Sequence, residues 1–107
     1  MTEVFRDLHP ELQPYATWLY RVAEYYGLGP KVTSTYRSYA TQARLYNRYL
    51  SGESPYPAAP PGRSLHNRGL AFDMVVKDQQ WLGNVWENIG GRWGGRFSDP
   101  VHFDVGL

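Results

Sequence analysis

The feature that most constrains this chain is an aspartate, Asp73, inside an apolar run that extends from Leu70 to Val76. Alternation along the run predicts a β-strand in which Asp73 lies on the opposite face from Phe72 and Met74. A carboxylate rarely lies in apolar surroundings without a strong partner, and a metal ion is one such partner. The run therefore predicts a strand that builds the core with one face and carries a ligand group on the other.

Two of the three histidines accompany apolar runs of this kind. His66 precedes Asp73 in the chain, and His102 lies in a second predicted strand at 101–105. Because the sequence contains no cysteine, any metal site must use nitrogen and oxygen ligands. Two imidazoles and one carboxylate form the three-ligand set of a hydrolytic zinc site, which leaves the fourth position open. The remaining histidine, His9, begins a predicted helix, and we interpret it as a surface or capping residue.

Hydrolysis at such a site also requires a general base and a positive group. Asp99, in a turn shortly before His102, is the candidate base for the attacking water. Arg37, at the end of a predicted short strand, is the candidate for polarising the substrate carbonyl and binding its charge. Ser64 and Asn67 are candidates for supporting or substrate-binding contacts.

Spacing alone leaves plainer interpretations open for the same residues. They are a hydrogen-bonded core histidine at His66, an edge-strand carboxylate at Asp73 and a surface ion pair at Arg37. A catalytic triad of Ser64, His66 and Asp73 fits less well, because Ser64 and His66 are too local and no nucleophile elbow surrounds the serine.

Length and composition predict one globular domain over residues 1–107. The content of 42% hydrophobic and 20% charged residues is ordinary for such a domain, and the net charge of +1 favours neither a nucleic-acid nor a membrane partner. The N-terminus lacks the apolar core of a signal peptide, so we expect synthesis in the cytoplasm.

Local patterns predict three helices, three strands and one long loop. A helix from about His9 to Tyr26 should bury the stripe Leu12, Tyr15, Ala16, Leu19, Val22, Ala23 and Tyr26. A second helix at 39–50, capped by Ser38, should turn Ala43, Tyr46 and Leu50 inward, with Leu45 as a further candidate. A third at 79–89 should bury Trp81, Leu82, Val85, Trp86 and Ile89. Strands are predicted at 31–36, 70–76 and 101–105, and the proline-rich stretch 51–63 is predicted to be a loop.

Three stretches resemble one known family. Pro61–Asp73 resembles the Ser-x-His-x-x-Gly-x-Ala-x-Asp signature of the D-Ala-D-Ala carboxypeptidase-like zinc peptidases, family M15. Trp93-Gly94-Gly95, followed by Asp99-Pro100-x-His102-Phe103, resembles the branch that contains phage endolysins and bacterial L-alanyl-D-glutamate endopeptidases. Tyr36-Arg37-Ser38, with Gln42, Leu45 and Tyr46, is similar to the Tyr-Arg-Ser-x-x-x-Gln-x-x-Leu-Tyr stretch of that branch.

The resemblance implies a fold and a set of functional residues. The fold is a small α+β domain of the hedgehog/D-Ala-D-Ala peptidase type, with helices packed on one face of a short antiparallel sheet. The resemblance implies that His66, Asp73 and His102 bind one zinc ion and that Asp99 is the acid/base. It also implies that Arg37, Gln42 and Ser64 contact the substrate or transition state. Family members often carry Glu or Gln after the final His-Phe, whereas this chain has Asp104.

The activity implied by the resemblance is zinc-dependent hydrolysis of the peptidoglycan stem peptide at the L-alanyl–D-glutamate bond. The enzyme is expected to be a monomer that acts on the cell wall after phage- or holin-type release. A D,D-carboxypeptidase or dipeptidase on the same scaffold is one alternative. The alternative of another class is an inactive, zinc-containing wall-binding module, against which Asp99 argues, because a pure binder has no need of that acid.

Overall fold

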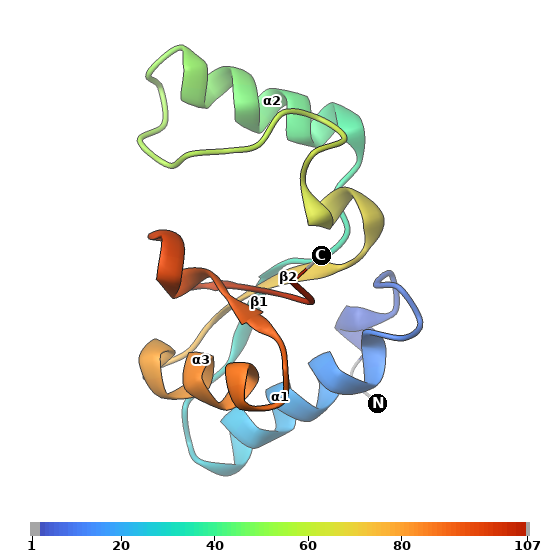
Figure 1. Ribbon diagram of the computed structural model, residues 1–107, viewed down its shortest axis with the longest axis vertical. Helices are drawn as coiled ribbons and strands as arrows, with labels where there is room; N and C mark the ends of the chain where they lie inside the picture. The colour runs from blue at the N-terminus through green and yellow to red at the C-terminus, as the bar shows by residue number, and fades with distance from the viewer. Residues whose placement is uncertain (1–2, 107) are drawn as a thin grey trace.

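A four-stranded antiparallel sheet organises the computed structural model, which describes residues 3–106 (Figure 1). Met1, Thr2 and Leu107, which the single-domain prediction includes, lie outside the described residues. The strands are β1 (Lys31–Ser34), β2 (Ala71–Val75), β3 (Arg92–Trp93) and β4 (His102–Asp104), in the spatial order β1-β2-β4-β3. The predicted antiparallel α+β architecture is therefore confirmed, and β3 is a strand that the sequence patterns did not predict.

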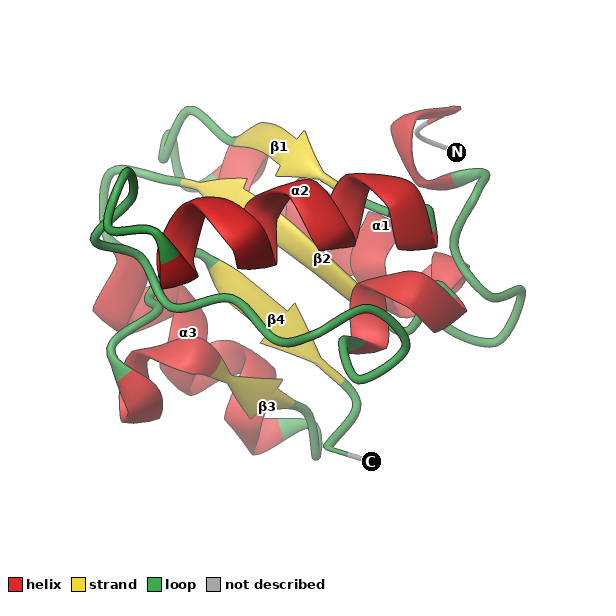
Figure 2. Ribbon diagram, turned by 90° about the horizontal axis from the view of Figure 1, so that it is seen from above, coloured by secondary structure: helices red, strands yellow, loops and turns green. Residues whose placement is uncertain are grey.

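Helices α1 (Gln13–Tyr25) and α3 (Gln79–Asn88) cover one face of the sheet and enclose the core (Figure 2). The strands contribute Phe72, Met74 and Phe103, and the helices contribute Leu19, Leu82 and Trp86 among others. As the alternation predicted, Phe72 and Met74 are fully buried while Asp73 points to the other face.

The buried stripes of both helices are narrower than predicted. Tyr15 and Tyr26 are exposed, because α1 packs on the sheet only through a thin line of smaller side chains that includes Ala16, Leu19 and Ala23. Trp81 in α3 and Ile89, the residue that follows the helix as its C-cap, are likewise exposed. The predictions that these four side chains are buried were wrong, since periodicity marks the inward direction but not the width of the contact.

Helix α2 (Tyr39–Leu50) lies on the other side of the sheet from α1 and α3 (Figure 2). Its bounds agree with the prediction, and the Ser38 hydroxyl caps it by accepting a hydrogen bond from the Thr41 N–H at 3.1 Å. The helix does not pack on the hydrophobic core, so Leu50 is 62% exposed rather than turned inward. Gln42 is its one buried residue. The expectation of helices on one face thus holds for α1 and α3 but not for α2.

Short 3₁₀ turns and loops complete the described chain. They are η1 (Glu3–Phe5), η2 (Leu65–Arg68) and η3 (Gly94–Phe97), and the predicted loop at 51–63 has no regular structure. Among the described residues, no helix combines the length and apolar character needed to cross a membrane.

Candidate metal centre

Three side chains converge on the face of the sheet that α1 and α3 do not cover. Asp73 on β2 and His102 on β4 are direct cross-strand partners, so their side chains share a face. His66 lies in η2. The Ser64 hydroxyl caps the start of this turn by accepting a hydrogen bond from the His66 N–H, and Gly69, with φ of 69°, ends it. One ligand atom from each of the three residues lies within 4.8 Å of the others.

Each imidazole is held by a hydrogen bond on the nitrogen that faces away from this point. The His66 Nδ1 lies 2.8 Å from the Thr35 carbonyl oxygen, which can only accept, so Nδ1 carries a proton and the lone pair of the neutral imidazole lies on Nε2. The His102 Nε2 lies 2.6 Å from the carboxylate of Asp104. This leaves His66 Nε2 and His102 Nδ1 facing Asp73 Oδ1 at 3.2 and 3.4 Å.

Two of the polar atoms that converge between His66, Asp73 and His102 lack hydrogen-bond partners. Among the described residues, His66 Nε2 and Asp73 Oδ1 are buried and make no hydrogen bond. Each such atom costs about 1–3 kcal/mol when it is left unpaired. A divalent cation would satisfy both atoms at once, and nitrogen and carboxylate oxygen are the donors that zinc accepts. The residues present therefore fit a zinc ion.

The ionisation of these groups is set by their contacts. Burial alone would raise the pKa of Asp73, but the adjacent imidazole nitrogens of His102 and His66 and the charge of Arg37 hold it well below its usual range. Burial opposes a charge on His102, yet the hydrogen bond to Asp104 and the nearby carboxylate of Asp73 outweigh it and raise the pKa of His102 to about 9. A proton on His102 is thus the competitor of any metal at this point.

Asp99, the predicted base, lies at the edge of the centre. Its Oδ2 is 3.9 Å from His102 Nδ1, and half of its side chain is exposed. Burial, followed by the negative charge of Asp73, raises the pKa of Asp99. The turn is fixed by hydrogen bonds from the Asp99 N–H to the Gly94 carbonyl (2.8 Å) and from the His102 N–H to the Asp99 carbonyl (3.0 Å).

Arg37 lies beside Asp73 rather than reaching into open space. Its Nε donates to Ser34 Oγ, its Nη1 to Gln42 Oε1 and its Nη2 to Asp73 Oδ2, at 2.9, 3.2 and 2.9 Å. The guanidinium therefore orients the Asp73 carboxylate, and all three of its nitrogens are engaged within the protein. A role of Arg37 at the substrate stays a prediction.

The two other predicted substrate contacts have structural partners. Gln42 is only 1% exposed, and its amide bridges Arg37 to the Ala59 carbonyl in the 51–63 loop. Its contact to substrate stays a prediction. Ser64 is half-buried as the cap of η2, and its contact to substrate stays a prediction. Asn67 donates to the Arg37 carbonyl and accepts from the Gly62 N–H, which joins the loop to η2. His9 is exposed, as the surface interpretation expects, and its Nδ1 accepts from the Glu11 N–H, but the N-cap of α1 is Leu12.

Asp104 and Arg92 are further neighbours of the centre, and sequence reasoning missed Arg92 and its ion pair with Asp104. Asp104 is completely buried, and its pKa falls to about 2 because hydrogen bonds from His102, Arg92 and Gly106 outweigh the effect of burial. The alternation of the last strand does put Asp104 on the same face as His102. The ion pair with Arg92 had no local signal, since β3 has only two residues.

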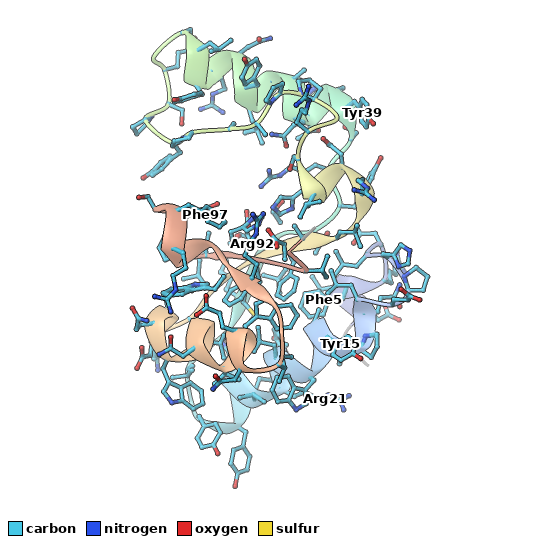
Figure 3. The ribbon with its side chains drawn as sticks, in the orientation of Figure 1. Phe5, Tyr15, Arg21, Tyr39, Arg92 and Phe97 are labelled. Atoms are coloured by element: carbon cyan, nitrogen blue, oxygen red, sulfur yellow. The ribbon has the colours of Figure 1, made fainter. Side chains whose placement is uncertain are left out.

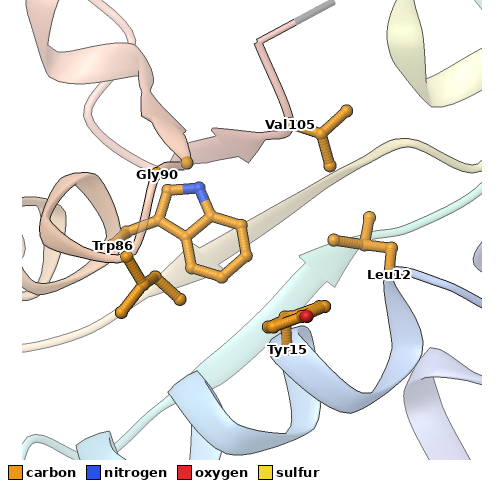
Figure 4. A pocket seen from close by; sticks show the side chains of 7 residues that line it. Leu12, Tyr15, Trp86, Gly90 and Val105 are labelled. Atoms are coloured by element: carbon orange, nitrogen blue, oxygen red, sulfur yellow. The ribbon is translucent and has the colours of Figure 1, made fainter.

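The apolar hollows of the surface lie elsewhere. One hollow of about 110 Å³ is lined by residues that include Leu12, Tyr15, Trp86 and Val105 (Figure 4). These side chains belong to the helices and to the core face of the sheet, so this hollow is not part of the histidine and carboxylate centre.

Residues 6–103 match the protein family described as VanY, D-alanyl-D-alanine carboxypeptidase. The chain belongs to this family, so it is a peptidase, and the resemblance noted in the sequence is confirmed. Among curated proteins it is 28% identical to the peptidoglycan L-alanyl-D-glutamate endopeptidase CwlK of Bacillus subtilis (strain 168), over 92% of this chain and 74% of CwlK.

Solved structures share the fold. A mutant of the vancomycin-resistance D,D-pentapeptidase VanY, in complex with Zn(II), has a TM-score of 0.74 and 22% identity, over 92% of this chain and 73% of that chain. The L-Ala D-Glu endopeptidase ChiX of Serratia marcescens has a TM-score of 0.58 and 24% identity, over 95% and 83% of the two chains. At these identities the likeness supports the fold, and the particular substrate requires an argument from the site.

Proposed function

We propose that this protein is a zinc peptidase that hydrolyses the stem peptide of bacterial peptidoglycan at the L-alanyl–D-glutamate bond. The observation that carries the proposal is the convergence of His66 Nε2, Asp73 Oδ1 and His102 Nδ1, two of them buried and unpaired, beside the half-exposed carboxylate of Asp99. The names of CwlK and ChiX support this choice of bond.

In the proposed mechanism, His66, Asp73 and His102 would hold a zinc ion, which when bound supplies Lewis-acid polarisation of the scissile carbonyl and lowers the pKa of water. Asp99 accepts the proton of the attacking water and returns it to the leaving amine. The raised pKa of Asp99 suits this exchange, because it makes the carboxylate a better acceptor of the proton and lets the carboxylic acid persist long enough to donate that proton again. Thr35 and Asp104 keep both imidazoles in the tautomers that leave the inward nitrogens free.

A second candidate function is removal of the terminal D-alanine as a D,D-carboxypeptidase. The family description and the VanY structures favour it, including a VanY structure in complex with D-alanine-D-alanine. Both reactions use the same centre, so the geometry of the three ligands does not choose between them.

Mass spectrometry of digested peptidoglycan separates the two functions. An endopeptidase should release stem peptides that begin with D-glutamate and leave L-alanine on the glycan, whereas a carboxypeptidase should release free D-alanine. Activity should disappear with a chelator and return when zinc is added. Release of neither product by the zinc-loaded protein would refute the proposed function.

A further inference from the structure

The face of the sheet that carries Asp73 and His102 also carries an arginine on the edge strand β3. Arg92 on β3 is the cross-strand partner of Asp104 on β4, so both side chains lie on the face that carries Asp73 and His102. Asp104 accepts from Arg92 Nε at 2.9 Å and from Arg92 Nη2 at 2.6 Å. The same oxygen of Asp104, Oδ2, contacts His102 Nε2 at 2.6 Å. Arg92 is therefore fixed directly beside a predicted metal ligand.

An aromatic ring fixes the guanidinium from a second side. The Arg92 Cζ lies 5.0 Å from the centroid of the Phe97 ring, and that ring is also in edge contact with His102 at 5.8 Å (Figure 3). A guanidinium over an aromatic face is a stabilising arrangement. With Asp104 on one edge and Phe97 against its plane, Arg92 has little freedom to reorient, which lowers the entropy lost when it binds a ligand.

One edge of this guanidinium is still available. Asp104 occupies the edge formed by Nε and Nη2, and within residues 3–106 the remaining nitrogen, Nη1, makes no hydrogen bond. The Arg92 side chain is 49% exposed, whereas Arg37, with all three nitrogens engaged, is 19% exposed. Of these two arginines beside the centre, Arg92 thus has the more accessible donors for a ligand.

We propose that Arg92 binds the free α-carboxylate of the substrate residue on the leaving side of the scissile bond. The inference rests on the proposed function and names the group by which that site selects its substrate. A glutamate whose chain continues through its side-chain carboxyl keeps a free α-carboxylate next to the scissile amide, and a terminal D-alanine also carries one. The Nη1 and Nη2 edge matches a carboxylate with two parallel hydrogen bonds.

The test compares two peptides that differ only in this group, one with the glutamate α-carboxylate and one with the α-amide. The ratio of their kcat/KM values is measured for each variant, so that losses of folded or zinc-loaded protein cancel. The wild type should prefer the carboxylate by roughly 10- to 100-fold, the usual worth of a charged hydrogen bond. Arg92→Gln should bring the ratio close to one, and Arg92→Lys should give an intermediate value.

Arg96→Gln is the matched control. Arg96 lies close by in the sequence, but it pairs with Glu87 on α3 and stacks over Trp93. This variant should keep the wild-type ratio. The melting temperature and zinc content of each variant report whether the loss of Arg92 also disturbs Asp104.

Two results would overturn the proposal: a wild type without preference for the carboxylate, or an Arg92→Gln variant that keeps the preference. The second, together with a lower melting temperature, would make Arg92 only the ion-pair partner of Asp104. If the wild type cuts neither peptide, the proposed function has failed, and calorimetric binding of the same two peptides decides the inference separately. A carboxylate preference in binding that Arg92→Gln removes would then support it, and equal binding would refute it.

Discussion

Replacement of Gly94 by alanine tests how closely Gly94 must approach Asp99 and His102 in the turn that carries Asp99. A Cβ atom at Gly94 would lie 2.2 Å from the Asp99 carbonyl oxygen and 2.7 Å from the Cβ of His102. Neither neighbour is the flexible end of a side chain, so the turn itself must move. Restoring ordinary contact requires a shift of roughly 1 Å.

This shift has an expected cost in stability and in rate. Overpacking of this kind lowers the free energy of unfolding by about 1–3 kcal/mol, which for a domain of this size is a Tm lower by roughly 5–20 °C. The shift acts on Asp99 and His102 together, and a displacement of about 1 Å in a catalytic arrangement can lower the rate about 10²-fold. We therefore expect Gly94→Ala to lose both kcat/KM and zinc affinity.

The assay combines thermal unfolding, zinc competition against a chromophoric chelator, and kcat/KM per folded molecule. Gly27→Ala is the control, because Gly27 has φ of 71° and open space around it, at the end of α1 on the far side of the sheet. Alanine there costs about 1 kcal/mol of backbone strain and should leave kcat/KM unchanged. Wild-type zinc affinity and kcat/KM in Gly94→Ala would refute the reasoning, as would an equal loss of kcat/KM in Gly27→Ala.

The other predictions concern the metal, the base, the pH and Arg37. Purified protein should bind one zinc ion per chain, and a chelator should lower its Tm; full zinc retention in both His66→Ala and His102→Ala, by elemental analysis, would contradict the ligand set. Asp99→Asn should keep its zinc while kcat falls about 10²–10⁴-fold, and near-normal turnover would give the role to another acid. In chelator-treated protein, the contacts of protonated His102 stabilise the fold fully below pH 6.5 and are lost as the pH rises through about 9, so Tm should fall across this window; a rising Tm would contradict the raised pKa. Arg37→Lys should lower kcat and kcat/KM together if Arg37 acts on the transition state, whereas a lower Tm with unchanged kcat/KM per folded molecule would leave it only the partner of Asp73.

Within the described residues, the sequence by itself determined the three α-helices, the strands β1, β2 and β4, and the three side chains that converge at the centre. Alternation in the run around Asp73 placed Phe72 in the core and the carboxylate on the opposite face, as the structure confirms. The capping serine at Ser38 gave the start of α2, because a cap acts on the backbone only three residues away. Residue chemistry and the family signature also named the three side chains that the fold brings together, His66, Asp73 and His102. These features are readable because each depends on neighbours in the chain or on a strong motif.

Tertiary structure alone decided which groups surround those side chains. Arg92 meets Asp104 only because β3 pairs with β4, and a two-residue strand carries no period to detect. The amide of Gln42 is buried between Arg37 and a loop carbonyl, although the helix that carries it lies off the core. The physical reason is that local sequence fixes the direction of a side chain, whereas its partners come from distant segments whose approach depends on the packing of the whole domain.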